Sequence, residues 1–266
     1  MCILRLVERA GFSKLRAMPN TAARAAADLA YVAPHLVLPG VITRFRQALE
    51  TDTATHQLEV GLFGMALCVR PLLLASQRQE MEVEGVVAEC LGATLAGLDA
   101  NDPLKTLSTL QLYLSVFSSA LPGLEFADWV AAFLDALFAL LRALEPPSDG
   151  AGPSFLMETN GASCYVPLLD LLFSRLPPPL FQMALAKVGG VVGGSPLRGA
   201  GAELGALCSA CLYAAPQATV KHLLEPQIAM LMELLKDCPS TGFAALSEEC
   251  LHHPPAVGGG WKEGGL

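Results

Sequence analysis

Apolar residues recur at helical spacing along most of the chain, and this pattern constrains the fold more than any other feature. The three clearest stripes follow i, i+3/i+4, i+7 spacing. The first consists of Leu58, Leu62, Met65, Val69 and Leu72, and the second of Trp129, Phe133, Leu137, Leu140 and Leu144. The third consists of Leu224, Ile228, Leu231 and Leu235. No run of alternating β-branched and polar residues with hairpin turns accompanies them. The sequence therefore predicts an all-α protein.

Short breaks separate the apolar stripes, around residues 50–53, 97–102, 121–123 and 238–240. Helices joined by connections this short pack as antiparallel neighbours. Aliphatic patches that contain Pro39, Pro167 and Pro226 resemble one another and are typical of HEAT repeats, which run about 40–47 residues each. We expect a HEAT-like or armadillo-like solenoid of antiparallel helix pairs, because broad apolar faces must be buried on neighbours. The prolines are irregularly spaced, so a compact helical bundle is the alternative.

The chain divides into three predicted regions. Residues 1–30 form a mildly basic helical segment, residues 31–250 the HEAT-like repeats, and residues 251–266 a disordered tail rich in Gly and Pro. Residues 1–50 carry seven Lys and Arg against three Asp and Glu, whereas the remaining residues carry ten against twenty-two. Direct nucleic-acid binding is not expected, because it requires a dense basic face.

Low charge content raises the question of a membrane span, since only 16% of the residues are charged against about 25% in most soluble domains. The longest uncharged run, residues 106–124, approaches the roughly 20 residues that a spanning helix needs. However, it contains many Ser, Thr and Gln side chains, which are unfavourable in lipid. We therefore expect apolar helices covered by other helices, and no membrane partner.

The eight cysteines lie mostly inside apolar helical patterns, where Cys behaves as a small hydrophobic residue. No secretory signal is recognisable in residues 1–30, so reduced thiols in the cytosol or nucleus are expected. Cys208 and Cys211 form a Cys-x-x-Cys pair within a smooth helical stretch. Possible further zinc ligands are scattered along the chain: Cys238, Cys250, His252 and His253. We predict buried thiols rather than a metal site, because structural zinc ligands come in close pairs in turns.

Catalytic motifs are absent from the sequence. The glycine-rich run 189–195 lacks the Gly-Lys-Ser/Thr of a phosphate-binding loop and follows no predicted strand, so a flexible interhelical loop is expected. His35, His56 and His222 lie near predicted helix starts, where capping or packing accounts for them. No nucleophile elbow, metalloprotease or kinase motif is present. We predict a protein that is not an enzyme.

The segment from Gly97 to Leu107 has the most specific sequence. Asn101 or Asp102 is predicted to cap a helix by accepting a hydrogen bond from its free backbone N–H groups, and Pro103 suits the first helical turn. The helix would then present one apolar stripe, made of Leu104, Leu107, Leu110, Leu114 and Phe117.

This segment and several others, in order, resemble the Blm-type proteasome activators, the proteasome activator complex subunit 4 family. The resemblance covers roughly residues 30 to 238, a middle portion of the longer family members. The positions that carry it are Pro39, Leu49, Glu50, His56, Asp99, Asn101, Asp102, Pro103, Lys105, Thr106, Trp129, Pro216 and Pro226. They are expected to be structural.

The resemblance implies a non-catalytic scaffold. Members of this family wrap into a helical dome on the end ring of the proteasome core particle and open its gate without ATP or ubiquitin. They act in the nucleus and cytoplasm, with links to acetylated histones and DNA repair. Full-length members bind inositol phosphates through basic clusters, but no such cluster can be placed in this sequence, so no cofactor site is assigned.

The end of the sequence departs from the family pattern. Family members dock through a C-terminal hydrophobic-Tyr-any motif, whereas this chain ends Trp261-Lys262-Glu263-Gly264-Gly265-Leu266. The family's histone-related segment also lies outside the matched stretch. We therefore expect an incomplete piece that does not activate a proteasome alone. A generic HEAT-type protein-interaction adaptor is the alternative.

Overall fold

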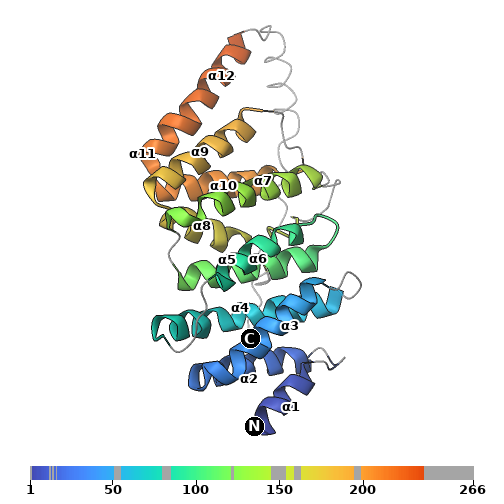
Figure 1. The fold of residues 1–266 in the computed structure, drawn as a ribbon. Helices are drawn as coiled ribbons and strands as arrows, with labels where there is room; N and C mark the ends of the chain where they lie inside the picture. The colour runs from blue at the N-terminus through green and yellow to red at the C-terminus, as the bar shows by residue number, and fades with distance from the viewer. Residues whose placement is uncertain are drawn as a thin grey trace, which may run out of the picture. The chain divides into compact units, whose positions relative to one another are not determined.

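All regular structure in the described part of the chain is helical, which confirms the all-α prediction (Figure 1). The computed structural model describes residues 2–11, 13, 15, 17–50, 55–79, 85–120, 123–144, 154–158, 163–194 and 199–236. The α-helices are α1 (Cys2–Ala10), α2 (Ala17–Val32), α3 (Pro34–Glu50), α4 (Thr55–Gln77), α5 (Val86–Ala93), α6 (Pro103–Ser119), α7 (Ala127–Ala143), α8 (Tyr165–Arg175), α9 (Pro178–Val192), α10 (Gly201–Ala214), α11 (Pro216–Thr219) and α12 (Glu225–Lys236). Two 3₁₀ turns, η1 (Leu95–Gly97) and η2 (Leu124–Phe126), and a π-helical turn, η3 (Val220–Leu224), complete the set.

The chain forms two compact units, residues 1–223 and residues 224–266. In the second unit the described part is essentially α12. The predicted boundaries after residues 30 and 250 remain predictions. The predicted tail, residues 251–266, lies outside the described residues.

The first unit is a stack of helices in chain order. Helix α2 packs on α4, α4 on α6, α6 on α8, and α8 on α10. Helix α3 packs against α2 and α4, and helix α7 packs against α9. Helices α3, α7 and α9 form a second layer beside the first (Figure 1). Each helix thus contacts its neighbours in the stack, which is the arrangement of a helical-repeat solenoid rather than a compact bundle.

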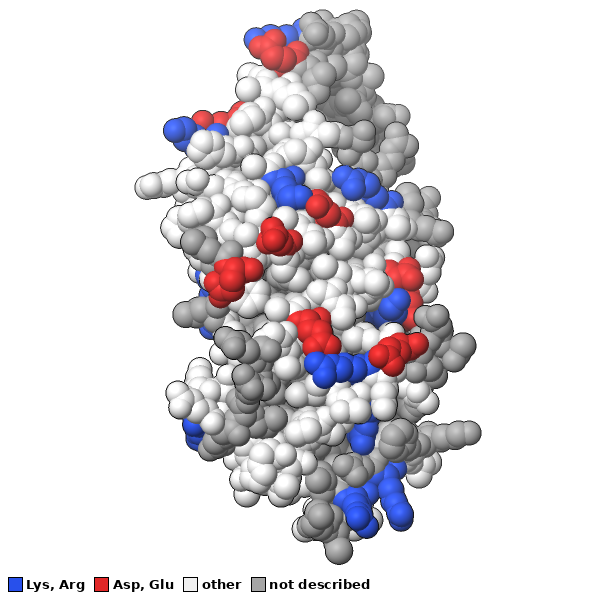
Figure 2. Space-filling model, in the orientation of Figure 1, with Lys and Arg blue, Asp and Glu red and all other residues white. Residues whose placement is uncertain are grey.

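Ion pairs join α3 to α5 and α7 to α9. Arg46 on α3 donates to both carboxylate oxygens of Glu89 on α5, at 2.7 and 2.5 Å. Lys187 on α9 donates to Asp135 on α7 at 2.6 Å. On the face shown in Figure 2, charged side chains lie in small groups separated by uncharged surface; some groups contain both signs, and those at the lower end of the view contain only Lys and Arg. The described helices are therefore joined mainly by apolar packing, with ion pairs at the surface.

Helix α4 lies in the middle of its part of the stack and packs against α2, α3 and α6. Its residues 57–77 are long and apolar enough to cross a membrane by length and composition, and half of the most apolar window is buried inside the unit. Of the predicted stripe on this helix, Leu62, Met65, Val69 and Leu72 are buried. Contact with three neighbouring helices accounts for the apolar composition of α4.

Helix α6 begins as predicted, but its buried face only partly matches the predicted stripe. Leu104, assigned to the apolar stripe, is 56% exposed, and Leu107 and Leu114 are only partly buried. The buried side chains are Thr106, Thr109, Leu110, Leu112, Tyr113, Val116 and Phe117. The prediction is confirmed for Leu110 and Phe117 and wrong for Leu104, because α6 contacts α4, α8 and η1, and its contact with η1 places two threonines inside.

Two further predictions need correction. The glycine-rich run was expected to be a loop, but Gly189 to Val192 belong to α9, and the N–H of Gly193 donates to the carbonyl of Gly189 at 2.9 Å. A methyl group added to Gly189 would lie 3.8 Å from Cδ1 of Leu223, so this end of α9 lies close to η3. Residues 195–198 lie outside the described part. Helix α12 forms where predicted, yet its stripe residues Ile228 and Leu231 are exposed.

Candidate functional site

The turn that leads into α6 contains the most specific sequence and a dense set of hydrogen bonds. Asp102 is the N-cap, and its Oδ1 accepts a hydrogen bond from the backbone N–H of Lys105 at 3.1 Å. Pro103 occupies the first turn. Asn101 does not cap the helix; its backbone N–H donates to Asp99 Oδ1 at 2.9 Å, and its side-chain amide lies 3.2 Å from the same oxygen. Of the two predicted caps, Asp102 is thus the one observed.

The side chain of Thr106 connects this turn to α6 through hydrogen bonds. Its hydroxyl is fully buried, accepts from the backbone N–H of Asp99 at 2.9 Å and lies 2.8 Å from the carbonyl oxygen of Asp99, to which it can donate. The carbonyl oxygen of Gly97 is also within reach, at 3.3 Å. One hydroxyl group therefore satisfies backbone groups that would otherwise be buried without partners.

The same turn brings Gly97 against Thr109, one turn further along α6. A methyl group on Gly97 would lie 3.3 Å from Cβ of Thr109 and would overlap the hydroxyl oxygen of that residue. That hydroxyl oxygen is buried and has no hydrogen-bond partner. The close contact requires glycine at position 97.

A second polar cluster joins α5, α6 and α7 through the carbonyl of Leu91. Trp129 Nε1 donates to this oxygen at 3.0 Å, and the hydroxyl of Tyr113 lies 3.3 Å from it. The hydroxyl of Thr94 donates to the carbonyl of Cys90 at 2.6 Å and lies 3.1 Å from the Tyr113 hydroxyl. Burial raises the pKa of Tyr113, so its phenol stays protonated and available as a donor.

Aromatic rings surround this cluster. Trp129 stacks on Phe133 with ring centroids 5.1 Å apart and an interplanar angle of 9°. Tyr113 meets Trp129 edge-on at 5.1 Å, and Phe117 lies 5.1 Å from Trp129. Such pairs contribute about 0.5–1.5 kcal/mol beyond their buried area. The indole of Trp129 therefore both fills the space between α6 and α7 and bonds to α5.

The remaining signature residues lie elsewhere. Pro39, Leu49 and Glu50 are on α3, Pro216 begins α11, and Pro226 is on α12. His56 lies in the first turn of α4, and its side chain is outside the described part of the structure. The structure thus gathers Asp99, Asn101, Asp102, Pro103, Lys105 and Thr106 at one turn, whereas the other signature positions lie on other helices.

The hydrogen bonds of the gathered residues show what these side chains contact. Their hydrogen bonds end on backbone groups or on one another. Among the described residues, no three His, Cys, Asp or Glu side chains lie close enough to hold a metal ion. Cys211 is buried on α10, and burial raises the pKa of its thiol to about 12, far from that of a reactive thiolate. Cys250, His252 and His253 lie outside the described range.

Glu203 on α10 is a buried carboxylate that the sequence did not single out, with 2% of its surface exposed. Its carboxylate accepts a hydrogen bond from the Ser154 hydroxyl, and its backbone carbonyl accepts one from the Tyr165 hydroxyl at 2.9 Å. It lies in the first turn of α10, where the helix dipole favours a negative charge. Glu203 therefore ties residues 154–158 and α8 to α10.

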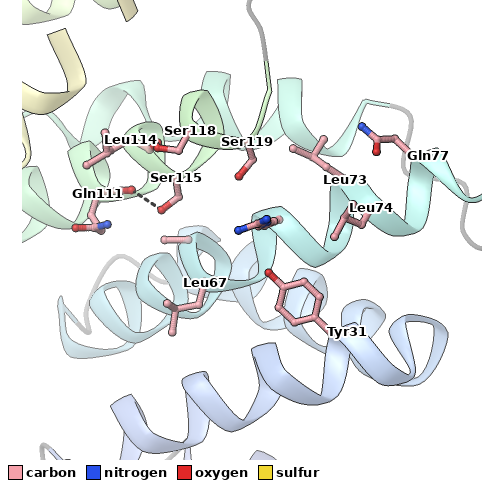
Figure 3. Close-up of a pocket in the computed structure, with 12 residues that line it drawn as sticks. Tyr31, Leu67, Leu73, Leu74, Gln77, Gln111, Leu114, Ser115, Ser118 and Ser119 are labelled. Atoms are coloured by element: carbon pink, nitrogen blue, oxygen red, sulfur yellow. Dashed lines mark hydrogen bonds between the residues drawn. The ribbon is translucent and has the colours of Figure 1, made fainter. Parts of the chain in front are cut away.

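A polar groove on the layer formed by α2, α4 and α6 was also missed (Figure 3). Its volume is about 660 Å³, and one charged side chain, Arg70 of α4, lines it together with Tyr31 of α2 and several Gln and Ser side chains. Arg70 is the one charged residue between Glu59 and Arg78 in the sequence, which is the signal that could have located the groove.

Comparison with known proteins agrees with this architecture. Residues 1–121 and 123–236 match the family model described as "Proteasome activator complex subunit 4, mid HEAT repeats region". The chain is 35% identical over 272 residues to "Proteasome activator subunit 4" of Arabidopsis thaliana, an alignment that covers 91% of this chain and 15% of that protein. It is 31% identical over 166 residues to "Proteasome activator complex subunit 4" of Homo sapiens, which covers 53% of this chain and 9% of that protein.

A relative from Xenopus laevis, "Proteasome activator complex subunit 4", is 28% identical over 220 residues, which covers 70% of this chain and 12% of that protein. The chain therefore spans a small part of the length of the curated relatives that it matches. The family model covers most of the chain, and its helical-repeat architecture is the one observed. The chain belongs to the proteasome activator complex subunit 4 family and corresponds to its middle HEAT-repeat region.

Proposed function

We propose that this chain is a scaffold segment in the wall of a proteasome activator that caps the end ring of the core particle and opens its gate. The segment contributes shape rather than catalysis, because stacked helices form one continuous wall. The observation that carries the proposal is the match of residues 1–121 and 123–236 to the middle HEAT-repeat region of an activator family.

The finer parts of the proposal concern conditions and partners. The activator works without ATP or ubiquitin, in the nucleus and cytoplasm, and the segment itself needs no cofactor. Contacts with acetylated histones, and sites for inositol phosphates, belong to other parts of the full-length protein. The family relationship supports these statements, and the internal hydrogen bonding of the turn into α6 agrees with a purely structural segment.

The experiment uses the full-length protein that contains this segment. It is mixed with core particles in the absence of ATP, and co-sedimentation and hydrolysis of a fluorogenic peptide are measured. We expect the activator to sediment with the core particle and to accelerate hydrolysis. A Gly97→Val variant, which would force apart η1 and α6, should reduce both, whereas Gly92→Ala, which meets no atom within 4 Å, should not.

Two outcomes would contradict the proposal. Absence of both binding and acceleration at high concentrations of a folded full-length protein would exclude an activator. Affinity capture that recovers another protein in stoichiometric amount, and no core particle, would favour a HEAT-type interaction adaptor instead.

A further inference from the structure

The groove on the α2, α4 and α6 layer has the volume of a ligand pocket and a largely polar lining. Its volume of about 660 Å³ falls within the roughly 300–1,000 Å³ of typical ligand pockets. Figure 3 shows Gln111 and Gln77 at opposite ends, Ser118 and Ser119 along the α6 side, and Tyr31 directed toward the middle from α2. The groove is therefore elongated, with polar groups along its length.

Arg70 is the one charged residue that lines the groove. Its side chain is exposed, and no carboxylate among the described residues forms an ion pair with it. By contrast, Arg46 on α3 and Lys187 on α9 have carboxylate partners from neighbouring helices. A guanidinium fork without a partner, in a groove with no competing anion, fits one carboxylate in a bidentate arrangement.

The α6 side of the groove offers hydrogen-bond acceptors. The Ser115 hydroxyl donates its proton to the carbonyl of Gln111 at 3.0 Å, and the Ser118 hydroxyl donates to the carbonyl of Leu114 at 2.6 Å. Each serine oxygen therefore keeps lone pairs for an incoming N–H group. Gln111 is held by the thiol of Cys164, which donates to Oε1 at 2.8 Å, so its amide N–H₂ stays available as a donor.

The α4 side supplies apolar contacts as well as the cation. Leu67, Leu73 and Leu74 line the groove beside Arg70. A ligand that matches all of these groups presents backbone N–H and C=O groups, an apolar side chain and a single carboxylate. A polyphosphate does not match, because one cation leaves most of its charge unpaired.

We infer that this groove binds an extended peptide segment carrying a Glu or Asp side chain, whose carboxylate pairs with Arg70. The peptide lies between α4 and α6, its N–H groups facing the serine oxygens and its apolar side chains facing the leucines. This site is separate from the proposed docking of the full-length protein on the proteasome, and its test does not involve the core particle.

The test is fluorescence anisotropy with the 266-residue chain and a fluorescein-labelled peptide, Gly-Ser-Leu-Glu-Leu-Ser-Gly. A twin peptide with Gln in place of Glu is the ligand control. Arg70→Gln should weaken binding of the Glu peptide about fivefold, as expected for an exposed ion pair, and should leave the weaker binding of the Gln peptide unchanged. Higher salt should reduce the difference between the two peptides.

Two matched variants complete the design. Arg142→Gln removes the same charge from an exposed position on α7, outside the groove, and should not change the affinity. Ser118→Tyr places a ring in the groove and should weaken both peptides; circular dichroism confirms that each variant is folded. Equal loss with Arg142→Gln and Arg70→Gln, equal affinity for the two peptides, or displacement of the Glu peptide by inorganic phosphate with no binding of the Gln peptide would overturn the inference.

Discussion

The Thr109 side chain lies so close to the α-carbon of Gly97 that no other residue fits at position 97 without movement. A methyl group there would lie 3.3 and 3.4 Å from Cβ and Cγ2 of Thr109 and would overlap its hydroxyl oxygen. This contact sets how closely η1 approaches α6.

Replacement of Gly97 by Ala should destabilise the fold by about 1–3 kcal/mol, the usual cost of overpacking a rigid core. For a chain of this size, each kcal/mol corresponds to roughly 2–4 °C in the melting temperature. Thermal denaturation followed by circular dichroism measures the change. The control is Gly92→Ala on α5, where an added methyl meets nothing within 4 Å and should stabilise by about 0.5–1 kcal/mol. Equal melting of the two variants would refute the contact.

Removal of the Asp102 cap should also lower stability. Asp102→Ala deletes the oxygen that accepts from the Lys105 N–H, and loss of an N-cap typically costs about 1 kcal/mol. The neighbouring Asn101→Ala, which removes an exposed side chain that does not cap the helix, should change the free energy of unfolding by less than about 0.5 kcal/mol. Denaturant unfolding of both variants tests the assignment, which fails if Asn101→Ala is the more damaging.

Trp129 is expected to be the most sensitive of the signature positions. Trp129→Phe keeps much of the packing but removes the N–H that bonds to the Leu91 carbonyl, at a cost of about 1–3 kcal/mol for the weakened buried pairing. Trp129→Ala should cost about 3–5 kcal/mol, since it also leaves a cavity. Tyr213→Ala is the comparison, because that ring is 81% exposed. Unfolding midpoints should rank the exposed substitution mildest, then Phe, then Ala.

The buried cysteines should be inert in the folded protein. Burial raises the pKa of the Cys68, Cys90 and Cys211 thiols from 9.0 to about 12. At pH 8 a thiol with that pKa is thiolate in about one molecule in ten thousand, so alkylation should be slow until the chain unfolds. Mass spectrometry after timed iodoacetamide treatment should find Cys208, which is half-buried, modified before these three. Early modification of Cys68 in the folded chain would contradict the packing of α4.

The raised pKa values of these buried thiols also predict how the stability of the fold depends on pH. A thiol whose pKa is raised by folding stays neutral in the folded state while the unfolded chain ionises above about pH 9. The unfolded state therefore binds fewer protons in this range, and stability falls as the pH rises from about 9 to about 12. Below pH 9 the thiols should contribute no pH dependence. A free energy of unfolding that rises between pH 9 and pH 12 would contradict the raised pKa of the buried thiols.

Several features could be predicted because they are local. Helical spacing predicts α4 and α7 together with their buried faces, and the Asp-Pro pair predicts the start of α6, since an N-cap and a first-turn proline act within four residues. The buried face of α6 could not be predicted in the same way. Thr106 and Thr109 are polar, and their burial depends on the residues that precede α6. Asp99 supplies hydrogen-bond partners to Thr106, and Gly97 leaves room for Thr109.

The sequence by itself determined the helices, their antiparallel connections and the family to which the chain belongs. Periodicity, capping and family motifs depend on residues that are close together in the sequence. Tertiary structure alone decided which groups meet: Trp129 with the Leu91 carbonyl, Glu203 with Ser154, and Arg70 with the polar groove. Trp129 and Leu91 are 38 positions apart in the sequence, and Glu203 and Ser154 are 49 positions apart. The groove is lined by α2, α4 and α6, which are not consecutive helices. Their formation depends on how helices stack, and a repeat pattern does not specify the side-chain partners in that stack.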